Sequence, residues 1–357
     1  MGFDRPAVNR TAEEGFVLAL TLWILAAIAV AVGLATLWAL DAVRNASAER
    51  FRVEDQLAMA STRDTLIYLG ATRQRTRAGL AVTVPTGAEQ ALRSLDDLGG
   101  LSADPVGGEL RLDGRPYAGL GGTTFSIQDE AGLFVLASPS NASLDGFLAW
   151  AGVPRDKIAV LRDAFLDYTD ADGLRRLNGA EKREYERTSR PPPPNRRLLL
   201  PAEVDRILGW NALPQALREQ LPEISTTFYS GALNLNTVPE SLLPAWIPGC
   251  PANCRRLVER RDQLPFRFAS DVELLLGIRL PGDPGVDYRF LADDTLRFTF
   301  WSHSGAAWRI HVRFTPLADR VGPWSVLAVH PTSRPGNDAP ARPTGSDLFA
   351  DEAVDRP

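Results

Sequence analysis

The feature that most limits how this chain can fold is a long apolar stretch near its beginning. From Phe16 to Leu40 the sequence contains no Asp, Glu, Lys, Arg or His. As an α-helix the stretch would be about 37 Å long, which exceeds the ~30 Å hydrocarbon core of a bilayer. A helix satisfies its backbone hydrogen bonds internally, as lipid requires. Trp23 and Trp38 lie toward its two ends, where interfacial aromatic residues are typical. The sequence therefore predicts one transmembrane helix over residues 16–40.

The rest of the chain has the composition of a globular protein. The 357 residues are 45% hydrophobic and 23% charged, which is enough for a buried core and more than one folding unit. A formal net charge of -5 gives no reason to expect a nucleic-acid partner. The sequence contains no G-x-S-x-G, H-E-x-x-H or P-loop motif, and we expect no catalytic role for its histidines. We therefore expect a protein that is not an enzyme.

The segment before the apolar stretch differs from a secretory signal. Such signals place a basic region before an apolar core of about 7–15 residues. Here three acidic residues and two basic ones stand among residues 1–15, and the apolar stretch is far longer. Ala46-Ser47-Ala48 offers an A-x-A cleavage pattern, but its composition also suits an exposed helix. A plain signal anchor that is not cleaved is the other alternative.

A short polar segment that ends in Gly15, followed by Phe16 and a long apolar helix, resembles the N-terminus of type IV pilins and pseudopilins. In that family a membrane peptidase cleaves after the glycine and methylates the new N-terminal residue. The resemblance implies cleavage between Gly15 and Phe16 and N-methylation of Phe16. Most members carry Glu at the fifth mature position, where this chain has Leu20. Minor pseudopilin K of type II secretion systems, which is placed at the tip of the pseudopilus, also lacks that Glu, so Leu20 is the position that indicates a tip subunit.

Beyond the apolar stretch the hydrophobic pattern changes along the chain. Residues 41–75 continue a weakly amphipathic helical pattern. Residues 123–138 are typical of a strand, a turn and a second strand, and residues 295–315 alternate as in a hairpin. A further strand is expected from Trp324. A sheet is therefore predicted from two distant parts of the chain, with a helical segment inserted between them.

The inserted segment carries the more specific resemblance. An Asp-rich loop is followed by Asn178-Gly179-Ala180-Glu181, by the proline-rich residues 190–197, and by the helical residues 200–210. The run Asn234-x-Asn236-Thr237 comes next. The order of these motifs resembles the inserted α-domain of the minor pseudopilin K family. The proline run is expected to be an extended connector.

This resemblance implies an α+β, pilin-like fold in which a long N-terminal transmembrane α-helix packs on a small antiparallel sheet, with a large all-α domain inserted between strands. The expected parts are a leader peptide (1–15), a transmembrane helix (16–40), its periplasmic continuation (41–75), the first half of the pilin-like part (76–140), the inserted α-helical domain (141–285), the second pilin-like half (286–331) and a disordered tail (332–357).

The resemblance also implies a function. It implies a structural minor pseudopilin that caps the periplasmic pseudopilus of a type II secretion system and helps to initiate its assembly, for export of folded proteins across the outer membrane. The implied partners are other minor pseudopilins, prepilin peptidase and the inner-membrane secretion platform. The implied location is the bacterial inner membrane, with a single transmembrane pass and the bulk of the chain in the periplasm.

Two sets of residues are candidates for stabilising the soluble part. Asp170, Asp172 and Glu181 belong to the densest acidic cluster, and closely spaced oxygen ligands suit Ca²⁺. An exposed loop with helix-capping aspartates explains the same pattern. Cys250 and Cys254 are the only cysteines, and in an oxidising compartment they would form a disulfide, with two free thiols as the alternative.

An alternative function is a membrane-anchored DNA-binding or DNA-uptake protein. Residues 234–278 contain two capping-box patterns, Thr237–Glu240 and Ser270–Glu273, and look like a helix-hairpin-helix unit. Such units present hairpin N–H groups and basic residues to a phosphate. Four arginines stand in the expected region: Arg255, Arg256, Arg260 and Arg261. Pro248 and Pro251 remove N–H donors from the hairpin, and for this reason we expect no nucleic-acid partner.

Overall fold

A computed structural model describes residues 14–83, 103–315, 322–332, 344 and 348–349 of the chain. The chain divides into two units, residues 1–57 and residues 58–357. Nearly all of the expected leader peptide and most of the expected C-terminal tail lie outside the described residues.

One continuous helix, α1 (Glu14–Thr72), carries the apolar stretch. Almost all side chains from Val17 to Leu57 are exposed. In the second unit, Thr62, Leu66 and Leu69 are buried, and their spacing of four and three residues places them on one face of the helix. The transmembrane helix and the continuation that the sequence predicts thus form a single element, which ends at Thr72.

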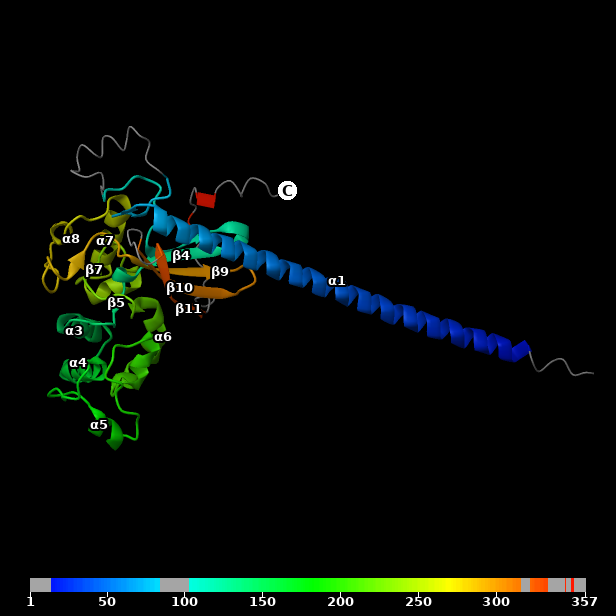
Figure 1. The fold of residues 1–357 in the computed structure, drawn as a ribbon, viewed down its shortest axis with the longest axis horizontal. Helices are drawn as coiled ribbons and strands as arrows, with labels where there is room; N and C mark the ends of the chain where they lie inside the picture. The colour runs from blue at the N-terminus through cyan, green and yellow to red at the C-terminus, as the bar shows by residue number, and fades with distance from the viewer. Residues whose placement is uncertain (1–13, 84–102, 316–321, 333–343, 345–347, 350–357) are drawn as a thin grey trace, which may run out of the picture. The chain divides into compact units, whose positions relative to one another are not determined.

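In the second unit α1 packs on a five-stranded antiparallel sheet of strand order β11-β10-β9-β4-β3 (Figure 1). The strands are β3 (Asp113–Ala118), β4 (Thr124–Asp129), β9 (Thr295–Trp301), β10 (Ala307–Phe314) and β11 (Trp324–Pro331). On the face toward α1, Phe125 is paired with Phe300 and Ile127 with Phe298 across β4 and β9. Gly70 of α1 admits the Phe314 ring, since a Cβ atom at Gly70 would lie 2.3 Å from Cζ of Phe314.

The helical insert leaves the sheet after β4 and returns before β9 (Figure 1). Its elements are β5 (Phe134–Val135), α3 (Asn141–Trp150), α4 (Arg155–Thr169), α5 (Lys182–Arg187), η3 (Pro201–Arg206), η4 (Trp210–Ala212), α6 (Gln215–Ile224), β6 (Ser225–Thr226), β7 (Leu233–Asn234), η5 (Glu240–Ala245), α7 (Ala252–Gln263), α8 (Ala269–Leu276) and β8 (Tyr288–Arg289). The remaining short elements are β1 (Arg75–Thr76), β2 (Gly79–Leu80), η1 (Leu120–Gly122) and η2 (Glu130–Gly132).

The insert has its own hydrophobic core. The rings of Phe134 and Phe147 are stacked with centroids 3.9 Å apart. Trp210 is fully buried, and its indole N–H donates to the Leu161 carbonyl oxygen at 2.9 Å. Together, α1, the sheet and this inserted helical domain confirm the α+β fold class that the sequence predicts.

One local prediction, that residues 123–138 fold back as two neighbouring strands, is corrected by the structure. β5 does not return beside β4; it pairs in parallel with β6. The turn η2 directs the chain into the insert, and Gly132 lies so close to Thr237 that a Cβ atom would be 2.5 Å from its carbonyl oxygen. The strand β3 lies at the edge of the sheet, next to β4.

The two predicted capping boxes are also wrong. Helix α8 begins at Ala269, because the carboxylate of Asp271 accepts hydrogen bonds from the backbone N–H groups of Arg267 and Phe268. Ser270 therefore lies within the helix. The hydroxyl of Thr237 donates to Asp129 at 2.9 Å, and the following helix η5 begins only at Glu240.

Candidate functional site

The described part of the chain contains one helix, spanning Val17–Thr72, that is long and apolar enough to cross a membrane. Its most apolar window has a mean hydropathy of 2.6 and no buried residues. Leu20 lies in this window and is 48% exposed. Gly15 and Phe16 lie in the first turn of α1, but their side chains are outside the described set. Cleavage at Gly15 and methylation of Phe16 stay predictions.

The acidic loop after α4 is organised around a buried carboxylate. Asp167 is fully buried and accepts hydrogen bonds from the backbone N–H and from the guanidinium of Arg176, the latter at 2.8 Å. The same guanidinium contacts Asp170. Gly179 leaves room for this arrangement, because a Cβ atom there would lie 1.9 Å from Oδ2 of Asp167. The glycine of the N-G-A-E motif therefore has a packing role.

The three residues predicted to bind calcium lie near one another in this loop. Burial raises the pKa of the Glu181 carboxyl, and nearby carboxylates that include Asp170 and Asp172 raise it further. One oxygen of Asp170 and one of Glu181 are buried without a hydrogen-bond partner among the described residues. Within the same residues, however, no three acidic, His or Cys side chains are arranged to hold a metal ion. The loop thus gathers negative charge, and calcium binding at these three residues stays a prediction.

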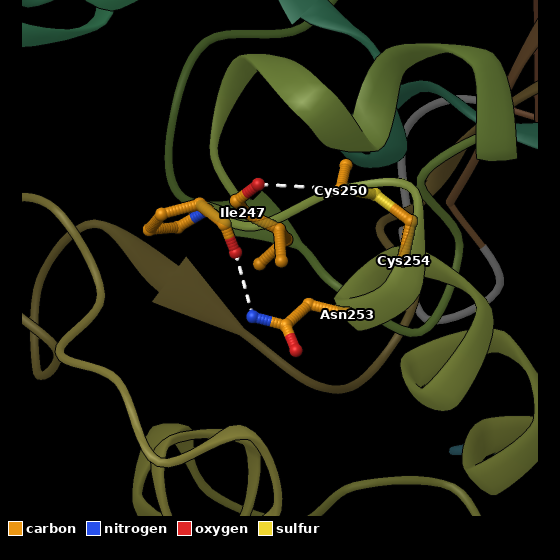
Figure 2. Close-up of a disulfide and its surroundings, with 5 residues drawn as sticks. Ile247, Cys250, Asn253 and Cys254 are labelled. Carbon is orange, nitrogen blue, oxygen red and sulfur yellow. Dashed lines mark hydrogen bonds between the residues drawn. A yellow bond between two sulfur atoms is a disulfide. The ribbon is translucent and has the colours of Figure 1, made fainter.

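Cys250 and Cys254 are joined by a disulfide with a Cα–Cα distance of 5.1 Å (Figure 2). The bond connects the loop after η5 to the first turn of α7, and Cys254 is buried. Asn253 donates from its side-chain amide to the Pro248 carbonyl oxygen at 2.7 Å. The disulfide and this hydrogen bond close a small, well-defined loop; oxidation of the pair in the cell stays a prediction.

The arginines of the helix-hairpin-helix-like segment are largely engaged in packing. Arg261 is only 3% exposed and donates to the carbonyl oxygens of Leu235 and Val238. Arg256 and Arg260 donate to carbonyl oxygens at the ends of α8 and α7. Three of the four arginines that could have met a DNA phosphate are therefore bonded within the insert.

The sequence alone did not identify the buried polar contact that connects the sheet to the insert. Asp129, at the end of β4, is fully buried. Its carboxylate accepts from the side chains of Asn234 at 2.8 Å and Thr237 at 2.9 Å, and from the backbone N–H groups of Ala131 and Asp293, both at 3.1 Å. Burial raises the pKa of Asp129, and these hydrogen bonds oppose the shift. The N-x-N-T motif is the sequence signal that could have indicated this contact.

A second buried polar contact lies on the sheet face that the insert covers. Nδ1 of His311 on β10 is 2.6 Å from Oε1 of Glu130, which is fully buried. Burial would raise the pKa of Glu130, but its contact with His311 and the charge of Arg297 hold it below the ordinary value. Arg297 donates to carbonyl oxygens at the end of α6 at 3.0 and 2.7 Å. Charged side chains thus fill the space between sheet and insert.

The chain was compared with protein families, curated proteins and solved structures. No protein-family model and no curated protein matches the chain. Among solved structures, it is similar to a chain in the crystal structure of the GspK-GspI-GspJ complex from the type 2 secretion system of enterotoxigenic Escherichia coli. That similarity covers 59% of this chain and 80% of the other, at 15% sequence identity and a TM-score of 0.43. A likeness at this level assigns neither family nor function, so the function has to be inferred from the residues of this chain.

Proposed function

We propose that this chain is a structural minor pseudopilin of a type II secretion system, without enzymatic activity. The observation that carries the proposal is the helix α1, which runs from Glu14 to Thr72, contains the Gly15-Phe16 junction and the whole apolar stretch, and packs through its last turns on a small antiparallel sheet. A helix that serves both as membrane segment and as part of the core suits a subunit that leaves the bilayer as a unit. A plain signal anchor does not need this continuity.

The proposed position of the subunit is the tip of the pseudopilus. A carboxylate in a membrane helix is costly unless it has a partner, and in pilins that partner is thought to be the N-terminal amine of a neighbouring subunit. Leu20 offers no carboxylate for such a contact. The helical insert between β4 and β9 adds bulk beside the sheet that would obstruct stacking of a further subunit. A subunit with both features would end the filament and help to start its assembly.

The proposed location and partners follow from this role. Prepilin peptidase would remove residues 1–15 and methylate Phe16, and the mature chain would stay in the inner membrane with its folded part in the periplasm. Other minor pseudopilins and the secretion platform would be its partners. The Cys250–Cys254 disulfide suits a periplasmic location, since disulfides persist in oxidising compartments. Quantitative alkylation of both thiols in protein taken from the periplasm without reductant would contradict formation of this disulfide in the cell.

Calcium binding at Asp170, Asp172 and Glu181 is also a proposal. Two buried carboxylate oxygens that have no hydrogen-bond partner among the described residues support it, while the Arg176 guanidinium already neutralises part of the loop. We expect Ca²⁺ to raise the unfolding temperature of the full chain relative to EGTA, and Glu181→Gln to remove that increase. Glu186→Gln, an exposed change on α5, is the matched control. An equal unfolding temperature with and without Ca²⁺ in the parent chain would contradict the proposal.

The decisive experiment is mass spectrometry of the N-terminus of the native protein, combined with cross-linking in membranes. An N-methylated Phe16 terminus and cross-links to other pilin-like subunits are expected. An intact N-terminus at Met1, or cross-links to none of these subunits, would contradict the proposed function.

A further inference from the structure

The proline-rich connector lines a cavity of about 510 Å³ on the insert. The connector contributes Arg190 and Pro191, the last turn of α4 contributes Tyr168, and η3 contributes Arg206. Helix α5, which precedes the connector, lies at the end of the insert away from β4 (Figure 1). The cavity is therefore separate from the sheet, from α1 and from the disulfide.

The charges around the cavity do not cancel. Arg196 is paired with Glu203 at 3.1 Å, and Asp205 is paired with Arg218 at 3.0 Å. Arg190 and Arg206 also line the cavity, and neither has a carboxylate partner among the described residues. The cavity wall therefore carries two positive charges that the described part of the fold does not neutralise.

Arg190 carries the strongest indication of a ligand. Its Nη1 atom is buried, and within the described residues it has no hydrogen-bond partner. An unsatisfied buried donor on a charged group is costly, and the cost is removed when an acceptor binds. The backbone N–H of Arg190 donates to the Tyr185 carbonyl oxygen at 3.0 Å, so the connector is anchored at this residue.

The rest of the wall favours an organic anion over a hydrated inorganic one. Tyr168 is 3% exposed. Burial and the Glu203 carboxylate raise the pKa of its hydroxyl. The guanidinium groups of Arg206 and Arg196 oppose this rise. Three prolines supply apolar surface without N–H donors: Pro191, Pro192 and Pro194. Guanidinium groups match the planar geometry of a carboxylate through paired hydrogen bonds.

We propose that this cavity, the Arg190 pocket, binds the carboxylate groups of an acidic peptide segment. Arg190 and Arg206 hold the carboxylates, and the prolines and Tyr168 pack against the apolar parts of the peptide. The pocket does not depend on the proposed role in secretion, because binding is a property of the isolated chain.

The test uses the purified full chain in detergent and two labelled peptides, GEEFEEG and its neutral analogue GQQFQQG, in fluorescence anisotropy titrations. Saturable binding of the acidic peptide only is expected. Because hydrogen bonds to charged groups are strong, Arg190→Gln and Arg206→Gln should each weaken binding about tenfold or more. Arg190→Lys keeps the charge but not the paired geometry, and it should also weaken binding. Arg183→Gln is the matched control, since Arg183 is exposed on α5 and does not line the pocket.

Several results would overturn the proposal. The first is that the acidic peptide shows no saturable binding at millimolar concentration. The second is that the neutral peptide binds as well as the acidic one. The third is that Arg183→Gln weakens binding of the acidic peptide as much as Arg190→Gln does. Displacement of the acidic peptide by inorganic phosphate at lower concentrations than by glutarate would assign the pocket to phosphate and would also overturn the peptide assignment.

Discussion

Along α1, the side chains from Val17 to Leu57 are exposed almost throughout, whereas Thr62, Leu66 and Leu69 in the following turns are buried. The secondary structure is the same in both parts, but the packing is not. An apolar surface as long as that from Phe16 to Leu40 is strongly unfavourable in water. The second part of α1 is therefore stabilised by the core of the fold, while the first requires an environment outside the chain, which we propose to be the bilayer and neighbouring subunits.

The helix offers matched residues for testing this difference. Gly33 stands in the exposed part with open space around the position of a Cβ atom, and Gly70 stands against the Phe314 ring. Thr36 and Thr62 both donate from the hydroxyl to a carbonyl oxygen four residues earlier, at 2.8 Å. The two glycines, and likewise the two threonines, allow one substitution to be compared between the exposed part and the packed part of α1.

The largest effect is expected at the start of the exposed part. Gly15→Ala should block maturation and assembly, because the peptidase would meet a side chain at its cleavage position. Gly33→Ala makes the same change inside the apolar stretch and should mature normally. Immunoblots that separate precursor from mature chain are the measurement. Normal maturation of Gly15→Ala would contradict the pseudopilin proposal.

The next largest effect is expected where α1 is packed. Gly70→Leu should lower the free energy of unfolding by about 3 kcal/mol, because the Phe314 ring would have to leave a well-packed core. Gly33→Leu should be neutral or slightly stabilising, since leucine favours a helix more than glycine does. Urea unfolding of the full chain in detergent, followed by near-ultraviolet circular dichroism, measures both. Equal stability of the two variants would mean that the second part of α1 is not held by the sheet.

Leu20→Glu tests what the exposed part contacts. A tip subunit gains nothing from a carboxylate at this position, and the insertion penalty is up to about 3 kcal/mol. Pull-down of partner pseudopilins and secretion should therefore be unchanged or reduced. Leu22→Glu introduces the same charge two residues further along and separates the insertion penalty from the effect of position. A clear gain in both assays for Leu20→Glu alone would instead indicate a subunit in the middle of the filament.

Features that depend on a local pattern could be predicted from the sequence, whereas contacts between distant segments could not. The membrane stretch and the β9–β10 hairpin were predictable because their patterns are local: an uncharged run and a two-residue alternation. The parallel pairing of β5 with β6 was missed, because the paired residues, Phe134 with Ser225 and Val135 with Thr226, lie far apart in the sequence. Thr237 fits a capping pattern locally, yet the buried Asp129 carboxylate takes its hydroxyl. The Arg190 pocket was not foreseen because its residues come from three separate segments.

The smallest predicted effect concerns a single hydrogen bond. The Thr62 hydroxyl donates to the Ala58 carbonyl oxygen and accepts from the backbone N–H of Leu120 at 3.1 Å, so it connects α1 to η1. Thr62→Val keeps the shape but leaves that N–H without an acceptor, and it should lower the free energy of unfolding by about 1 kcal/mol. Thr36→Val loses only a bond within the helix and should change stability by less than about 0.5 kcal/mol, because Thr36 is exposed.

Thr62→Ser keeps the hydroxyl, so it should keep the hydrogen bond, although it removes a methyl group from a fully buried site. Urea unfolding of the full chain measures all three. If Thr62→Val and Thr36→Val cost the same, the contact with Leu120 contributes nothing, and the apolar packing of Leu66, Leu69 and Gly70 accounts for the difference between the two parts of α1.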